Sequence, residues 1–309
     1  MSNIRTLTKT CAGALAGGVL GAGVLLAGAG AVHAQEAFPK GFIPLPAGTS
    51  LAIGYYIYQH DNEFTINTGP TYTKNTGREV NLSVGEYVHY VEVAGHPAGF
   101  KIIQTFGSLS GAQINGRSVG SAFGAQNTAL SAFIWPYVDF QHHAYLVTYG
   151  YLYPPDGTYD QHSPINVGDN RWRGDIAVGF DKAFGPRFSF DVGFDTMFYG
   201  DNDNPFNNGH LPPGARLSQD NTYRGQVFLN WNFSRSVWGS IGWEGFFGGV
   251  QYLNGSANGS ATKEQRLRAD LSAFVTPAAK VLLELNHDVQ VSGGFKQDLG
   301  ATMRLVYAF

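Results

Sequence analysis

The chain has 309 residues, a formal net charge of −3 and only 14% charged residues. This composition excludes a basic nucleic-acid surface, so no nucleic-acid partner is expected. The single cysteine, Cys11, excludes a disulfide framework. After residue 34 there is no run of about 18 apolar residues, which excludes a helical membrane protein. Glycine and aromatic residues are abundant, and no ten-residue stretch has clean helical periodicity, which favours an all-β chain.

The first 34 residues have the pattern of a secretory signal peptide. Arg5 and Lys9 form a basic start, residues 11–31 are uncharged, and residues 32–34 offer a small-residue cleavage site. Residues 1–34 are therefore predicted to direct export by the Sec pathway and then to be cleaved. An uncleaved membrane anchor is the alternative, although the many glycines and alanines of this segment would make a poor spanning helix.

A proline-rich segment follows the signal peptide. Pro39, Pro44 and Pro46 lie within residues 35–47, and proline cannot donate a hydrogen bond to a strand ladder. Residues 35–47 are predicted to be an extended periplasmic lead-in, part of which can enter the domain that follows. Residues 48–309 are predicted to form that domain.

The N-terminal half of the domain has five candidate strands with indistinct alternation. The first has a simple pattern, since Leu51, Ile53, Tyr55 and Ile57 share one face, which is expected to point outward. Tyrosines also share a face in the fifth, but the pattern does not indicate which side it occupies. The five strands are predicted near residues 49–58, 86–93, 100–109, 128–136 and 144–153.

Seven further strands are predicted after residue 173, with much clearer alternation. In residues 187–199, phenylalanine and valine occupy one face and polar residues the other, and residues 222–233 repeat the pattern. Each run is about ten residues long, the length that crosses a bilayer at a tilt. The total is about twelve, an even number, which places both termini on the periplasmic side.

The links between these strands alternate between short and long. Residues 233–236 and 276–279 are short turns, whereas residues 200–221 and 252–265 are long, polar loops. Outer-membrane barrels have short periplasmic turns and long external loops. The turn at Gly185-Pro186 must hold an odd number of residues or a bulge, because an even count would pair opposite faces of the flanking strands.

The final strand also has one apolar face, in which Leu305, Tyr307 and Phe309 are the last members. The terminal phenylalanine resembles the C-terminal recognition signature of bacterial outer-membrane proteins, so these three residues are the expected assembly signal. The barrel assembly machinery and outer-membrane lipid are then expected partners. The alternative is an edge strand of a soluble β-sandwich. The sequence therefore predicts an all-β fold, namely a transmembrane antiparallel β-barrel of about twelve strands in the bacterial outer membrane.

Four segments also resemble a known family. Residues 45–59, 165–180 and 200–209 and the final strand are similar to the outer-membrane channels named for the meta-cleavage pathway of phenol degradation. Residues 154–159 (PPDGTY) depart mildly from the usual pattern of the family. The resemblance implies a channel linked to the catabolism of aromatic compounds.

Charged residues on the predicted inner face are candidates for a constriction that orients a solute. If the hairpin is centred near residue 278, Arg268 faces Asp288, and Arg304 lies diagonal to Glu284 or Asp288. The four acids exceed the two arginines and predict a preference for cations. The alternative is a structural network that neutralises charge inside a narrow barrel. The candidates are Glu244, Arg268, Asp270, Glu284, Asp288 and Arg304.

Aromatic residues on the inner face form a second candidate set. They would favour planar apolar solutes through stacking, which contributes about 0.5–1.5 kcal/mol per pair. The alternative is simple packing or plugging of the lumen. The candidates are Tyr56, Tyr58, Phe228, Trp238, Phe246 and Phe274.

Catalytic and metal sites are weakly indicated. His287 lies on the outward face with no nucleophile motif nearby, whereas Asp201, Asp203 and His210 could meet at the external rim. The two aspartates have the start of a calcium-loop spacing, but Pro205 occupies the third ligand position. No catalytic residue, metal or cofactor is therefore predicted.

Three functions remain open. The first is a passive channel for small hydrophobic or aromatic compounds. The second is a structural or adhesive barrel with a plugged lumen, and the third is a hydrolase at the external rim.

Overall fold

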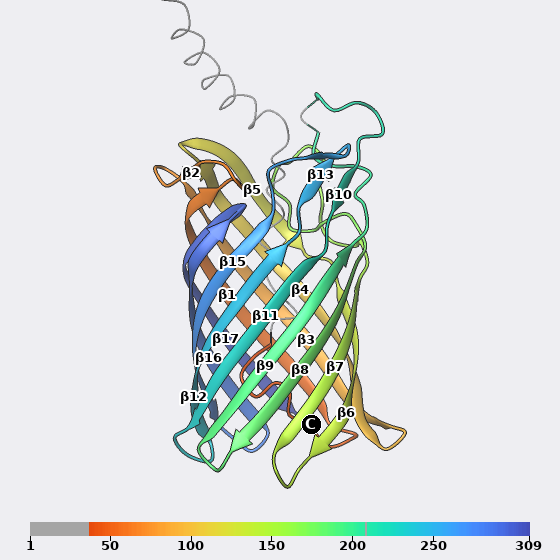
Figure 1. Cartoon of the computed structure of the whole chain (residues 1–309), viewed down its shortest axis with the longest axis vertical. Helices are drawn as coiled ribbons and strands as arrows, with labels where there is room; N and C mark the ends of the chain where they lie inside the picture. Colours follow the sequence, from red (N-terminus) through yellow and green to blue (C-terminus); the bar gives the residue numbers. More distant parts are fainter. Residues whose placement is uncertain (1–36, 208) are drawn as a thin grey trace, which may run out of the picture.

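The computed structural model describes residues 37–207 and 209–309, which form a closed antiparallel β-barrel (Figure 1). The predicted signal peptide, residues 1–34, lies outside the described residues. No helix in the described part of the chain is long and apolar enough to cross a membrane.

Twelve strands of the described chain form the barrel wall, which confirms the predicted architecture. Each strand pairs with its neighbour in the order of the chain, and the last pairs with the first, so the wall has no free edge. In order they are β1 (Ser50–Thr65), β3 (Gly77–Val93), β4 (His96–Ile114), β6 (Ala129–Asp139), β7 (Ala144–Tyr153), β8 (Arg173–Phe184), β9 (Phe188–Tyr199), β11 (Thr222–Asn232), β12 (Val237–Gly248), β15 (Thr262–Phe274), β16 (Ala279–Ser292) and β17 (Gly294–Ala308).

Five shorter strands extend the wall or decorate its loops. The strands β2 (Thr71–Tyr72) and β5 (Arg117–Ala125) lengthen the sheet at one end. A small separate sheet consists of β10 (Leu217–Gln219), β13 (Gln251–Leu253) and β14 (Ser256–Ala257). It joins the two long loops that the sequence predicts.

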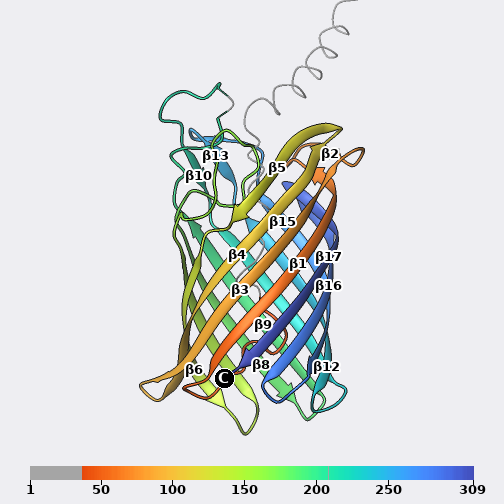
Figure 2. The same ribbon diagram turned by 180° about the vertical axis from the view of Figure 1, so that it is seen from behind.

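The two ends of the barrel differ in loop length (Figures 1 and 2). Short turns and the C-terminus lie at one end, and the long loops lie at the other. The turn between β8 and β9 contains three residues, because Phe184 pairs with Phe188. This odd count agrees with the sequence prediction and keeps the apolar residues of both strands on the same face.

The outer wall exposes a broad apolar surface. Leu283 is 51% exposed, and Leu305, Tyr307 and Phe309 at the end of the chain lie on this same surface. So large an exposed apolar area would promote aggregation in water, but it matches the hydrocarbon core of a bilayer. The sequence phase of the C-terminal strands therefore gives the correct orientation.

The orientation predicted for β1 is wrong. Leu51, Ile53 and Tyr55 are buried on the inner face, whereas Tyr56 is 50% exposed on the outer face, and Tyr58 shares the phase of Tyr56. The prediction assumed that apolar residues face lipid and polar residues face the lumen. That assumption fails here because the lumen next to β1 is filled with apolar side chains.

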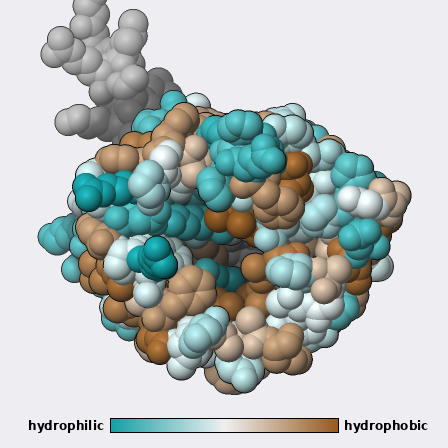
Figure 3. Space-filling model, turned by 90° about the horizontal axis from the view of Figure 1, so that it is seen from below, coloured by the Kyte–Doolittle hydropathy of each residue, from teal (hydrophilic) through white to brown (hydrophobic). Residues whose placement is uncertain are grey.

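Residues 37–47, hereafter the plug segment, supply that filling. Phe38 and Phe42 are buried in one apolar cluster with inward side chains of β1, β3, β4, β6 and β7. The segment predicted as an extended lead-in thus lies within the barrel, near the end with the short turns (Figure 1). Seen from that end, the molecule remains hollowed at its centre (Figure 3).

Candidate functional site

The plug segment is fixed to the wall by hydrogen bonds from its backbone. The Ala37 N–H donates to Gln226 Oε1 at 3.3 Å, and Arg268 Nη1 donates to the Ala37 carbonyl at 3.2 Å. The Lys40 N–H donates to Asp191 Oδ2 at 2.8 Å. These bonds satisfy backbone groups that would otherwise be buried without partners.

Aromatic packing fixes the other part of the plug segment. Trp135 Nε1 donates to the Phe42 carbonyl at 2.7 Å. The Phe42 ring lies 6.4 Å from that of Tyr149, and the Phe38 ring meets that of Tyr55 edge to face at 5.7 Å. The segment thus contacts opposite sides of the lumen through a few side chains.

The inner wall next to the plug segment is aromatic. On β7, Tyr149 stacks on Tyr151 and Tyr151 on Tyr153, with ring centroids 6.0 and 6.2 Å apart. This result decides the face that the sequence left open for β7, since its tyrosines point inward. Phe133 of β6 packs against Tyr149 at 5.4 Å and extends the surface.

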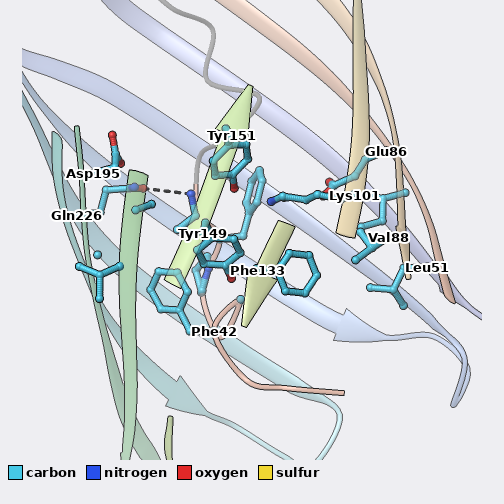
Figure 4. Close-up of a pocket in the computed structure, with 18 of the residues that line it drawn as sticks. Phe42, Leu51, Glu86, Val88, Lys101, Phe133, Tyr149, Tyr151, Asp195 and Gln226 are labelled. Carbon is cyan, nitrogen blue, oxygen red and sulfur yellow. Dashed lines mark hydrogen bonds and ion pairs between the residues drawn. The ribbon is translucent and has the colours of Figure 1, made fainter. Parts of the chain in front are cut away.

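A cavity of about 110 Å³ lies between this aromatic wall and the plug segment (Figure 4). Phe42 and Phe133 border it together with Tyr149 and Tyr151, whereas Glu86 and Lys101 point toward it from β3 and β4. It thus combines flat apolar surfaces with a few charged groups, as small-molecule sites do. Its charged lining residues are Glu86, Lys101, Asp195, Arg224, Lys280 and Arg304.

Three of the predicted constriction residues meet on the inner wall. Arg268 contacts Glu244 Oε2 at 3.0 Å and Glu284 Oε2 at 2.5 Å, and all three side chains are buried. Asp270 lies directly opposite Glu284 in the ladder between β15 and β16. The guanidinium of Arg268 thus compensates carboxylates from both neighbouring strands.

The predicted pairing of Asp288 is wrong. Arg268 lies opposite Asn286, and Asp288 instead pairs with Arg266 at 2.7 Å. The hairpin is centred on residue 277, because the Val275 N–H bonds to the Ala279 carbonyl. Moving the centre by one residue shifts every cross-strand partner by two.

Arg304 lies diagonal to Glu284, as predicted, but not to Asp288, and the carboxylate nearest to it is on another strand. Arg304 lies opposite Leu282, and its Nη2 is 3.7 Å from Glu86 Oε2 on β3. The long side chain points along the lumen past Tyr55 of β1, with which its guanidinium is in contact at 5.3 Å from the ring centroid. Sequence phase alone cannot reveal a contact that spans three strands.

The predicted aromatic set is divided among three locations. Phe228, Trp238 and Phe246 are buried on the inner wall. Phe274 shares their phase but is 47% exposed, with its ring 5.6 Å from that of Trp238. Tyr56 and Tyr58 belong to the outer phase, as described above for β1.

Sequence reasoning missed the residues that surround the cavity. Glu86, Lys101 and the tyrosines of β7 lie on strands whose phase was not resolved. Lys101 did carry a usable signal, because it stands between Phe100 and Ile102, which are both exposed on the outer wall. A single lysine between two lipid-facing residues indicates an inward charge.

The opposite end of the lumen is narrowed by the loop between β7 and β8. Ile165 and Val167 of this loop are buried against Val80 and Leu109, which point inward from β3 and β4. This second apolar cluster lies on the side of the long loops. The cavity is therefore bordered by the plug segment, with a folded loop at the far end of the lumen.

The external rim does not assemble a catalytic or calcium site from the predicted residues. Arg216 Nε lies 2.9 Å from Asp201 and 3.1 Å from Asp203, so an arginine compensates both carboxylates. Within residues 37–207 and 209–309, no group of three histidine, cysteine, aspartate or glutamate residues is placed to hold a metal.

Comparison with solved structures finds barrels of similar fold. The COG4313 outer-membrane channel from Pseudomonas putida F1 is similar over 89% of this chain and 100% of its own, with a TM-score of 0.82 and 22% identity. The β domain of the Bordetella autotransporter BrkA is similar over 82% of this chain and 98% of its own, with a TM-score of 0.50 and 9% identity. At these identities, the similarity shows the fold alone.

Comparisons of sequence point to one family. No curated protein sequence matches the chain. The family described as "Putative MetA-pathway of phenol degradation" matches residues 62–305, which is most of the barrel. The chain therefore belongs to this family.

Proposed function

We propose that this protein is an outer-membrane channel for small hydrophobic or aromatic compounds. The observation that carries the proposal is the cavity with aromatic walls, which lies inside a barrel whose wall has no free edge. The family description, which names phenol degradation, supports the same class of solute. The similar barrel from Pseudomonas putida F1 is itself described as an outer-membrane channel.

The inner wall suits such a solute where its charges are paired. Arg268 compensates Glu244 and Glu284, and Arg224 contacts Asp195 at 2.6 Å. Paired charges oppose the passage of an apolar molecule less than isolated charges do. Stacking on aromatic side chains would favour a planar solute by about 0.5–1.5 kcal/mol per ring pair.

The plug segment is the part of the lumen that must shift to widen the passage. It has no strand pairing with the wall and is attached by side-chain hydrogen bonds and aromatic contacts. Such contacts break individually, whereas removing a barrel strand would expose a row of unsatisfied backbone groups. Movement of the plug segment would therefore widen the passage and leave the barrel intact.

Export and assembly complete the proposal. The Sec pathway would carry the chain to the periplasm, and the barrel assembly machinery would recognise Leu305, Tyr307 and Phe309 on the lipid-facing side of β17. Both termini would then be periplasmic, and the position of the C-terminus at the end with the short turns supports this for the C-terminus. Outer-membrane lipid would contact the exposed apolar belt.

A permeation assay tests the channel function. The purified protein is placed in liposomes whose outer leaflet contains lipopolysaccharide, and the rate at which toluene and phenol enter is measured. Substituting Ala177→Trp, which adds a large ring to the lining of the cavity, should abolish the added permeation. Ala269→Trp on the outer face is the matched control and should leave it unchanged.

The alternative function is a structural or adhesive barrel with a closed lumen. The plug segment and the inward loop with Ile165 and Val167, which narrow the lumen from both ends, favour it. Folded wild-type protein that adds no permeation and no conductance would support this alternative and contradict the channel.

A further inference from the structure

The lumen contains one carboxylate flanked by two cations. Lys101 Nζ lies 3.9 Å from one oxygen of Glu86, and Arg304 Nη2 lies 3.7 Å from the other. A direct charge-assisted hydrogen bond is about 2.7–2.9 Å long, so neither cation is bonded directly to Glu86. The Tyr55 hydroxyl, in contrast, does donate to Glu86. The two cations thus lie near the carboxylate with donor capacity left over.

Arg304 shows this unused capacity directly. Its Nε is buried and has no hydrogen-bond partner among the described residues. Its guanidinium is held between aromatic rings, 4.7 Å from the centroid of Phe38 and 5.3 Å from that of Tyr55. A buried donor without an acceptor is costly, so this position favours binding of an oxygen atom.

A flat apolar surface lies beside the second cation. Lys101 Nζ is 4.8 Å from the ring centroid of Tyr151 and 5.1 Å from that of Tyr149. The two rings stack with an interplanar angle of 24°. Figure 4 shows Lys101 and these two tyrosines together at the cavity. An aromatic ring against this surface would have its substituent next to the ammonium group.

The cavity lining has an excess of positive charge. Four basic side chains and two carboxylates line it. Arg224 and Asp195 neutralise each other at 2.6 Å, and Lys101 and Arg304 both lie beside the single carboxylate of Glu86. The volume of about 110 Å³ is of the same order as the cavity of about 150 Å³ that binds benzene in another protein, so it leaves room for no more than a single ring.

We propose that this cavity binds aromatic monocarboxylates. The carboxylate lies between Lys101 and Arg304, and the ring packs against Tyr149 and Tyr151. The inference rests on the proposed channel function and narrows its solute class. It differs from the preference for cations expected from the sequence, because that expectation omitted Lys101.

Equilibrium binding to the purified full-length barrel in a nonionic detergent tests the site. Isothermal titration calorimetry with benzoate, the neutral isostere benzamide and ring-free acetate separates the roles of charge and ring. We expect benzoate to bind at least about tenfold more tightly than either reference compound, because a hydrogen bond to a charged group is worth at least that factor. Equal affinities for benzoate and benzamide would overturn the proposal. Equal affinities for benzoate and acetate would show that the aromatic ring adds nothing to binding, which would overturn the proposed packing against Tyr149 and Tyr151.

Two substitutions with opposite expected effects on benzoate affinity distinguish a change in the site from a loss of folding. Lys101→Met keeps the length of the side chain and should reduce benzoate affinity to that of benzamide. Glu86→Gln removes the competing carboxylate but keeps an acceptor for Tyr55, so it should strengthen benzoate binding. Lys263→Met, on the exposed face of β15, is the control and should change nothing. A preference for benzoate that survives Lys101→Met, or that weakens in Glu86→Gln, would contradict the site.

The binding and permeation results are independent. If toluene permeates but benzoate does not bind preferentially, the channel stands and the anion site fails. If benzoate binds as expected while no solute permeates, the site stands and the channel function fails.

Discussion

Gly179 of β8 lies directly against the ring of Phe42, so that a Cβ atom at position 179 would overlap the ring. Gly193 on the adjacent strand is also close, with a Cβ there lying 3.2 Å from Phe42 Cζ. Neither glycine has a positive φ. Their lack of a side chain therefore serves to make room for the plug segment, and the backbone conformation does not require glycine.

The substitution Gly179→Ala should displace the plug segment. The added methyl group competes with the Phe42 ring for the same space, while alanine fits the strand backbone without strain. We expect a higher single-channel conductance in planar bilayers, or longer open times. Gly150→Ala is the control, because a Cβ there meets no atom within 4 Å. Unchanged conductance in Gly179→Ala would show that Phe42 does not limit the passage.

Lys40 should hold the plug segment closed. Its ammonium donates to Asn232 and lies 4.8 Å from the ring centroid of Trp238. Lys40→Met removes both interactions and should make channel openings more frequent. Lys280→Met is a matched control, because Lys280 also lies over Trp238, at 5.6 Å, but belongs to the wall. Equal effects of the two substitutions would assign the change to Trp238 and its surroundings, with no special role for the plug segment.

The sequence predicted the barrel because its C-terminal strands separate apolar and polar residues cleanly. Leu283 and Glu284 follow each other in β16 and face lipid and lumen respectively. Lipid is a uniform solvent, so each outward position has the same requirement and the pattern is strictly periodic. Strand number and loop lengths could therefore be predicted as well.

The N-terminal half was less predictable because its inner face is apolar. The plug segment packs Phe38 and Phe42 against Tyr55 and Tyr149, so both faces of these strands carry large apolar residues. A period-two pattern of apolar residues then no longer indicates which face of the strand points toward lipid. The cavity was missed for the same reason, and the partner of Arg304 was missed because a contact across three strands depends on barrel tilt.

Arg268 should be the most sensitive charged residue on the wall. Arg268→Met leaves Glu244 and Glu284 buried without their shared cation. Breaking a buried ion pair costs roughly 3–5 kcal/mol, and we expect a loss of that order in the unfolding free energy from a urea titration. The triple variant that adds Glu244→Gln and Glu284→Gln should recover most of the loss. A single variant as stable as the wild type would show that water reaches these groups.

A charged residue on the outer face of β16 should destabilise the barrel. Leu283 is exposed on the apolar belt, and an arginine near the bilayer midplane costs about 2–4 kcal/mol in a barrel. Leu283→Arg should therefore lower the unfolding free energy in lipid vesicles by that amount. Ser256→Arg in the exposed short strand β14 is the control and should cost much less. Similar costs at the two positions would contradict the assigned lipid face.

Ion selectivity tests whether Glu244 and Glu284 form a constriction or a neutralised network. The sequence predicted a preference for cations from its excess of acids, but Arg268 contacts both carboxylates at 3.0 and 2.5 Å. We therefore expect these two carboxylates to confer no strong preference for cations on the wild type.

The double variant Glu244→Gln with Glu284→Gln removes the two carboxylates that contact Arg268, so more of its positive charge acts in a low-dielectric passage, where charge matters more than in bulk water. The reversal potential under a salt gradient should then shift toward anion preference, and it should not shift for the exposed Asp298→Asn. A wild type with strong cation selectivity that the double variant loses would instead establish these carboxylates as an exposed constriction.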